Sequence, residues 1–271
     1  MNIPQSVLRK RKKHFLVGFF GKRNPQRSLN SGSTNLMNGF EKMFSRWNEG
    51  FYAQPFYFLS EFIALIIGFV FVRKYKIGLL FLVYITFDFS IFIIDMYIQN
   101  FSSLLRKDKL LLFSITNTLI YLIEISVYYY FFYNALNSIR VKKFIIFSYI
   151  LFNCCCLTYL MARLLNRSAT YVSDTLGALE FILLIPICFT YYRELFNEPI
   201  INLFQRPSFW ITTGIFFYAS VSLPYYLLNE PLFYSDSQHY RKITSLLFNI
   251  PFGINFLFLT RAFLCKRHLT I

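Results

Sequence analysis

Ionisable side chains stand inside stretches of this sequence that are otherwise apolar. Five of them are acids: Glu61, Asp88, Asp95, Glu124 and Glu180. Two amides, Asn117 and Asn249, and one cation, Arg163, have similar surroundings. A charge in an apolar environment is costly unless a partner or a ligand compensates it, so such residues are functional candidates. We therefore take these eight residues as a candidate ligand-binding set.

Sequence spacing places several of these groups on shared helix faces. Asp88 and Asp95 are seven residues apart, which is about two helical turns and hence one face. Asn117 and Glu124 have the same spacing. The excess of acids favours carboxyls that are protonated in an apolar environment, or neutralised by a cation or an amine ligand. The alternative is a set of hydrogen bonds between helices that only fixes their packing.

Seven apolar stretches must position these residues. They cover residues 55–72, 77–98, 110–133, 144–164, 174–195, 208–228 and 243–263. Each approaches or exceeds the roughly 20 residues that a helix needs to cross a bilayer. Lipid offers no hydrogen-bond partner to a bare backbone, so spans of this kind are helices. The sequence predicts an all-α, polytopic membrane protein with a bundle of seven transmembrane helices over residues 55–265.

Short connections make consecutive spans antiparallel, which allows their depths to be compared. We call side A the face at which the first span begins, and side B the opposite face. Counting along each span puts two acids, Asp88 and Glu124, near the midplane. The half nearer side A receives the remaining six: Glu61, Asp95, Asn117, Arg163, Glu180 and Asn249. We expect these six to converge in one polar cavity, with the other two beneath it.

Composition agrees with this class and excludes others. Charged residues make up 15% of the 271 residues, against about 25% in soluble domains. The net charge is +15, but outside residues 1–54 the cations mostly flank the spans, which indicates a lipid partner and no nucleic acid. Tyrosines near the ends of the spans fit an interfacial aromatic belt.

No motif of a known chemistry stands out. The spans contain no His, and neither a Gly-x-Ser-x-Gly element nor a Walker motif occurs, so we predict no metal, no cofactor and no catalytic residue. Three of the five cysteines, Cys154, Cys155 and Cys156, are consecutive, which is typical of small apolar fillers rather than of a disulfide framework.

Residues 1–54 differ in kind from the rest of the chain. They hold ten Lys or Arg against two Glu. Three interpretations are open: a polybasic arm that binds anionic lipid or nucleic acid, a disordered tail, or a start of translation at Met37 or Met43. With a start at Met43, side B carries 11 Lys or Arg against 8 on side A. The positive-inside rule then puts the amino terminus outside and the carboxy terminus in the cytoplasm.

Three segments resemble a known group of proteins. They are Phe58–Gly68 with the following Arg73–Lys76, Tyr191–Phe196, and Arg206–Ile211 with the following Gly214–Tyr218. Together they are similar to small, uncharacterised seven-helix integral membrane proteins of Bacteroidetes-type bacteria. The resemblance covers about residues 55–265 and implies a seven-helix fold in a bacterial inner membrane.

Function is therefore an open choice among three classes. We expect a receptor-like sensor or transducer, with its pocket in the side A half and its output on side B. The connection from Arg193 to Pro207 is amphipathic, and it is either a docking surface for a cytoplasmic or membrane signalling partner or an interfacial linker. The alternatives are a small proton- or cation-coupled transporter and a membrane scaffold protein.

Overall fold

The computed structural model describes residues 53–72, 76–101, 106–165, 173–197, 203–233 and 238–265. These residues form seven α-helices and one short 3₁₀ helix, with no strand among them. The helices are α3 (Ala53–Phe71), α4 (Lys76–Phe101), α5 (Arg106–Ala135), α6 (Ile139–Leu165), α7 (Ser173–Phe196), η1 (Leu203–Gln205), α8 (Pro207–Phe233) and α9 (Gln238–Phe263).

Each apolar stretch of the sequence lies in its own helix, so the all-α prediction with seven helices is confirmed for these residues. The predicted tail over residues 1–54 lies outside the described residues except for Ala53 and Gln54, which open α3. Most helices run past the apolar stretch into polar flanks, because backbone hydrogen bonding continues wherever residues allow it. Helix α5, for example, begins at Arg106 and includes Asp108 in its first turn.

Three of the described helices are long and apolar enough to cross a bilayer, judged by length and composition. The segments are Lys76–Ile98 of α4, Ile139–Ala162 of α6 and Thr175–Phe196 of α7. A shorter apolar segment, Pro55–Phe71, lies in α3. These helices give the chain membrane-protein character.

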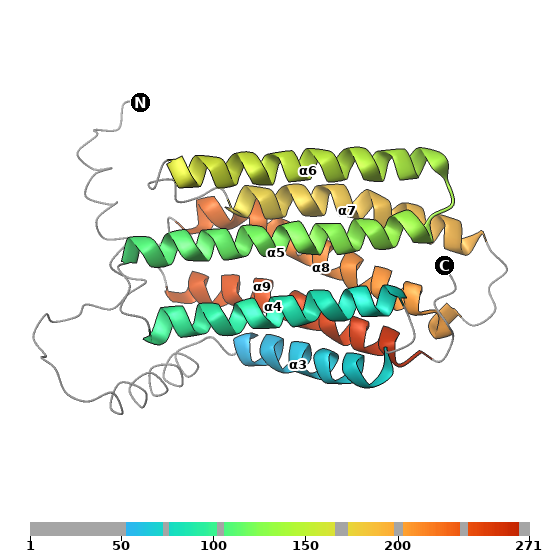
Figure 1. Cartoon of the computed structure of the whole chain (residues 1–271), viewed down its shortest axis with the longest axis horizontal. Coiled ribbons are helices and arrows are strands. Elements are labelled where there is room, and N and C mark those ends of the chain that lie inside the picture. The colour runs from blue at the N-terminus through green and yellow to red at the C-terminus, as the bar shows by residue number, and fades with distance from the viewer. Residues whose placement is uncertain are drawn as a thin grey trace, which may run out of the picture.

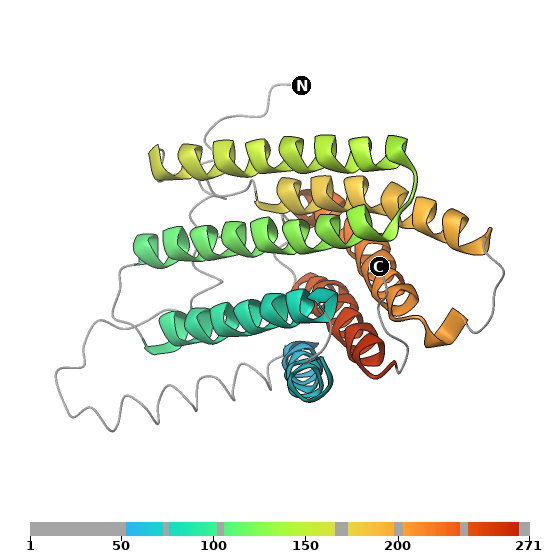
Figure 2. The same cartoon turned by 45° about the vertical axis from the view of Figure 1, so that its right-hand side comes forward.

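The helices lie side by side and alternate in direction (Figure 1). Helices α3, α5, α7 and α9 begin at the left of this view, which is side A, and α4, α6 and α8 begin at side B on the right. Each helix packs against the next in sequence, and α9 packs against both α8 and α3. The seven helices therefore form a closed ring, inside which α5 also contacts α7 (Figure 2).

Glycines allow the closest approaches between helices. A Cβ atom built on Gly177 of α7 would lie 2.5 Å from the ring of Tyr226 on α8. One on Gly253 of α9 would lie 2.7 Å from the ring of Phe56 on α3. One on Gly214 of α8 would lie 2.6 Å from the side-chain oxygen of Asn255 on α9. Small residues at such points let helix backbones pack tightly, as is common between membrane helices.

Candidate functional site

Four of the predicted carboxyl residues lie in the interior of the bundle. Glu61 of α3 and Glu180 of α7 are 0% exposed, Glu124 of α5 is 1% exposed and Asp88 of α4 is 2% exposed. Both carboxyl oxygens of Glu61, both of Glu180 and one of Glu124 have no hydrogen-bond partner among the described residues. Unpartnered buried oxygens are uncommon because they lose their hydration without compensation.

The four carboxyl residues share one depth, which we call the carboxyl layer. At about 1.5 Å per residue, Glu61 is about 15 Å from the side B end of α3, Asp88 about 18 Å from that of α4, and Glu124 about 16 Å from that of α5. The Glu194 carboxylate bonds to the Asn137 backbone at side B, which sets the register of α7 and puts Glu180 about 21 Å above that contact.

This common depth differs from the two tiers expected from the sequence. Counting from the ends of the apolar stretches puts Glu61 and Glu180 nearer side A than Asp88 and Glu124. The apolar stretches, however, differ in length, from 18 residues over 55–72 to 24 residues over 110–133, so a depth counted from the side A end of each stretch is a poor reference. The packing of neighbouring helices sets the levels instead.

Neighbouring members of the layer interact in series. Asp88 interacts electrostatically with Glu61 on one side and with Glu124 on the other. Glu124 in turn interacts with Glu180. The series therefore runs through α3, α4, α5 and α7, across the bundle rather than along it.

Tyrosine hydroxyls stand between these carboxyls. The Tyr57 hydroxyl donates a hydrogen bond to Asp88 Oδ2 at 3.1 Å. Tyr84 lies near both Glu124 and Asp88, and its hydroxyl has no hydrogen-bond partner among the described residues. The Tyr128 hydroxyl, next to Glu124, accepts a hydrogen bond from Asn255 Nδ2 at 3.1 Å. The layer is thus a mixed array of carboxyl and phenol groups.

The sequence interpretation missed these tyrosines. It assigned tyrosines near span ends to an interfacial belt, whereas Tyr128 is fully buried and only Tyr130 of that run is largely exposed. A signal was present: Tyr57, Tyr84 and Tyr128 each lie four residues from an acid of the layer. Residues four apart share a helix face, so a tyrosine at that spacing follows its acid into the interior.

The remaining predicted site residues are placed less completely. Asn249 is buried on α9, at 7% exposure, and Asn117 is half-buried on α5. Asp95 lies in α4 and Arg163 in α6, but their side chains lie outside the described part of the chain. The expected convergence of Asp95 and Arg163 with the other predicted site residues therefore stays a prediction.

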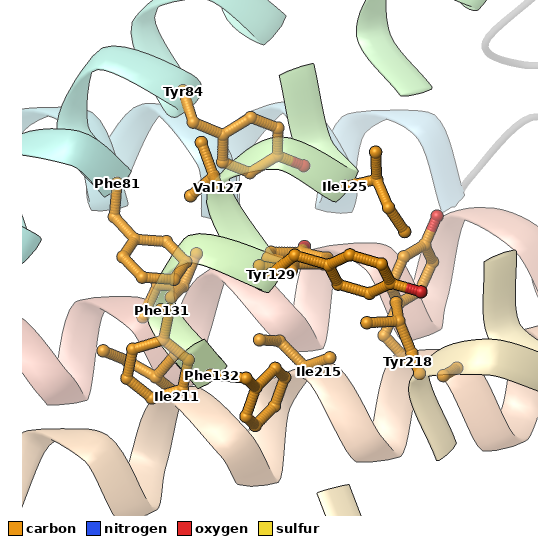
Figure 3. Close-up of a cluster of buried hydrophobic side chains, with 14 of the residues drawn as sticks. Phe81, Tyr84, Ile125, Val127, Tyr129, Phe131, Phe132, Ile211, Ile215 and Tyr218 are labelled. Atoms are coloured by element: carbon orange, nitrogen blue, oxygen red, sulfur yellow. The ribbon is translucent and has the colours of Figure 1, made fainter. Parts of the chain in front are cut away.

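The interior between the carboxyl layer and side B is aromatic. Phe81 of α4 and Phe131 of α5 have ring centroids 5.8 Å apart, and Phe132 lies 5.0 Å from Phe131. Tyr191 of α7 contacts both α5 rings. We call these four residues the aromatic block. Figure 3 shows three of them with Ile211 and Ile215 of α8 beside them, so large apolar side chains fill this half.

Toward side A the interior is richer in hydroxyl groups. The Ser114 and Tyr159 hydroxyls are 3.0 Å apart, and the Tyr121 and Tyr226 hydroxyls are 3.2 Å apart. Ser60, Thr118, Ser222 and Asn249 are also buried on this side of the layer or level with it. Buried polar side chains occur toward side B as well, on Thr212, Asn255 and Thr260, but the two hydroxyl pairs lie in the side A half.

The side B end is held together by polar contacts of another kind. Glu194 of α7 accepts hydrogen bonds from the backbone N–H groups of Asn137 at 2.9 Å and Ser138 at 3.3 Å. The Trp210 indole N–H donates to the Phe204 carbonyl at 2.8 Å. The Arg261 guanidinium lies 5.6 Å from the centre of the Trp210 ring. Trp210 thus joins η1, α8 and α9.

These features define an all-helical protein of membrane character with buried acids. Among the described residues, no three His, Cys, Asp or Glu side chains come together as they would around a metal ion. In comparisons with known proteins, no family model, no curated protein and no solved structure matches this chain.

Proposed function

We propose that this chain is an integral membrane protein of a bacterial inner membrane with all seven helices spanning the bilayer, and that it acts as a receptor-like sensor. The resemblance to seven-helix proteins of Bacteroidetes-type bacteria supports this location. So do the outward side chains of α6, where Phe147, Leu157 and Met161 are largely exposed. Such side chains suit a lipid surface, and the carboxyl layer then lies near the middle of the ~30 Å hydrocarbon core.

The observation that carries the proposal is the layer of buried carboxyls, in which both oxygens of Glu61, both of Glu180 and one of Glu124 lack a hydrogen-bond partner among the described residues. A membrane protein that keeps such groups at mid-depth needs a proton or a cation to compensate them, because a bare carboxylate there is costly. Occupancy of the layer can therefore couple an external condition to the packing of four helices. A sensor of this kind responds to protons or cations that enter from side A.

The position of the two hydroxyl pairs supports sensing over transport. A sensor needs access to its site from one face only, whereas alternating access requires both. The hydroxyl pairs lie between the layer and side A, while the aromatic block lies between the layer and side B. A change at the layer then reaches side B through the packing of these rings.

The single indole of the described residues offers a direct test. Trp210 lies at side B and contacts Phe204, Phe258 and Arg261, so its fluorescence reports on the packing of α8 and α9. In lipid nanodiscs, with Trp47 replaced by Phe, titration of pH and salt should change the Trp210 emission. The change should be lost in Asp88→Asn and in Glu124→Gln, which remove a charge with little change of shape.

The control is Asp108→Asn, which makes the same acid-to-amide change at an exposed position in the first turn of α5. It should keep the full response. If instead Asp88→Asn and Glu124→Gln respond normally while unfolding more easily than the parent protein, the carboxyls serve only packing. That result would rule out the sensor.

A small proton- or cation-coupled transporter is the second candidate. Secondary carriers bind their ions near the middle of the bilayer, at the depth of the carboxyl layer. In sealed liposomes, a transporter would collapse an imposed proton or sodium gradient, and Asp88→Asn would abolish the flux. The sensor leaves the gradient intact.

A further inference from the structure

The interior between α5, α6 and α7 contains one end of the carboxyl layer and two buried hydroxyl groups. They are the Glu180 carboxyl, the Tyr129 hydroxyl and the Ser148 hydroxyl, one from each helix. Their residues are 0%, 2% and 0% exposed in that order. All four of their side-chain oxygens lack a hydrogen-bond partner among the described residues.

Tyr129 connects the other two groups. Its hydroxyl interacts with both the Glu180 carboxyl and the Ser148 side chain, yet none of these oxygens makes a hydrogen bond with another. Figure 3 shows the Tyr129 ring extending away from Phe131 and Phe132, with its hydroxyl beyond the aromatic block. The three groups are thus neighbours that do not satisfy one another.

Ser148 is unusual among the hydroxyl residues of these helices. Ser126 and Thr118 on α5, Thr158 on α6 and Thr190 on α7 each donate to the carbonyl four residues earlier. That bond is available to any Ser or Thr inside a helix. Ser148 does not make it, and its side chain interacts with the Tyr129 hydroxyl of α5 instead.

Oxygens that surround a cation have these properties. Each directs a lone pair at the ion, so neighbouring oxygens need not exchange a hydrogen bond with one another. The described Lys and Arg side chains of the three helices, Arg140, Lys142, Lys143 and Arg193, all lie in the turns at the side B end. Glu180 interacts electrostatically with Glu124, another acid.

We propose that Glu180, Tyr129 and Ser148 bind a monovalent metal cation between α5, α6 and α7. One carboxylate and one such ion form a neutral pair, which removes the cost of an isolated charge in the interior. The two hydroxyls complete the oxygen set with their lone pairs. The proposal deepens the sensor function, since it names the ion for one end of the carboxyl layer.

A thermal unfolding experiment tests it on the full chain in lipid nanodiscs. At one pH and one ionic strength, the salt is NaCl, KCl or choline chloride. The ion binds the folded state, so the midpoint in NaCl or KCl should exceed that in choline chloride. It should rise by roughly 3–5 °C per tenfold increase in ion concentration above Kd. Equal midpoints in all three salts would overturn the proposal.

Variants assign the effect to the site. Glu180→Gln should abolish the dependence of the unfolding midpoint on Na⁺ or K⁺. Tyr129→Phe and Ser148→Ala should each weaken binding of the ion at least tenfold. The matched control is Thr212→Val, which removes another buried hydroxyl without a described partner. Thr212 lies five residues after the start of α8 and is therefore much nearer side B than Glu180. Its variant should keep the full dependence of the midpoint on Na⁺ or K⁺.

A second measurement covers variants that fold poorly. Line broadening of the ²³Na signal by the parent protein reports ion binding without unfolding. Excess K⁺ should reverse the broadening, and excess choline should not. Retention of the ion effect in Glu180→Gln would overturn the site. If the parent protein shows no effect of Na⁺ or K⁺ but its Trp210 emission still responds to pH, this inference is refuted alone and the sensor proposal stands.

Discussion

At the residue scale, Asp88 is the member of the carboxyl layer with a clear hydrogen-bond donor. The Tyr57 hydroxyl reaches it across the α3–α4 interface at 3.1 Å, and the Tyr57 ring also packs against Phe92 and Phe252. The phenyl ring thus fixes the hydroxyl, and the hydroxyl fixes the acid. Asp88 should therefore depend on Tyr57 for its position.

Tyr57→Phe tests that dependence. The change keeps the ring and removes one buried hydrogen bond to a carboxyl, so the free energy of unfolding should fall by about 1–3 kcal/mol. Denaturation in mixed micelles measures it. Tyr130→Phe, at a position that is 55% exposed, should change it by less than about 0.5 kcal/mol. Equal effects at the two positions would contradict the assignment.

The acids of the layer could be found from sequence and their levels could not. A carboxyl in an apolar stretch is visible in the sequence, as Glu61 and Glu180 are. Its depth depends on the length of its helix and on the register between helices, which for α7 the contact of Glu194 with Asn137 fixes. Ser148 looks like any other serine until its missing backbone bond is seen.

At the element scale, Glu194 is the acid that joins two helices outside the layer. Its carboxylate accepts from two backbone N–H groups at the start of α6, which otherwise lack partners within that helix. A negative charge there also favours the helix dipole. The Tyr191–Phe196 segment, one of those in the family resemblance, therefore has a structural role at the α5–α6 turn.

Removal of this contact should weaken the bundle. Glu194→Ala should lower the free energy of unfolding by about 1–2 kcal/mol, because it leaves the end of α6 uncapped. Glu194→Gln should lose less, since an amide oxygen can still accept. Arg193→Gln, at the exposed neighbouring position, is the control. A smaller loss for Glu194→Ala than for Arg193→Gln would exclude the cap.

Close helix packing gives a second prediction at this scale. A side chain at Gly214 would meet Asn255, whose amide holds the Tyr128 hydroxyl. Gly214→Val should therefore lower the free energy of unfolding by about 1–3 kcal/mol through overpacking. Leu227→Val, an exposed position on α8, is the control. Equal stability of the two variants would show that α8 and α9 can move apart at little cost.

At the scale of the whole molecule, the positive-inside rule gives the orientation to test. Reporter fusions after Lys143 and after Ile271 should report cytoplasm, and a fusion after Lys107 should report the outside. The opposite pattern would show that the basic residues 1–54 control insertion.

Cys265 offers a second probe from side B. Burial raises the pKa of its thiol, although Arg261 opposes this. The thiolate is the reactive form, so labelling of Cys265 by a thiol reagent should become faster as pH rises.

The helices were predictable at this scale because apolar length sets them. Which helices pack together was only partly predictable. Short connections explain why α3 packs on α4, but nothing local in the sequence pairs α9 with α3. That contact depends on Gly253, which admits the Phe56 ring and the Ser60 hydroxyl. A glycine in a span has many uses, so its partner appears only in the folded ring.

The closed ring also has a consequence for the order of assembly during synthesis. Glu61 meets Asp88 and Tyr57 as soon as the first two helices have left the ribosome. The other face of α3 must wait until α9 emerges, because only α9 supplies Gly253 and Phe252 to it. Until then the face of α3 that α9 covers has no partner helix in the unfinished chain, and α3 carries Glu61. A polypeptide that stopped after α8 would therefore leave this face of α3 without its partner helix.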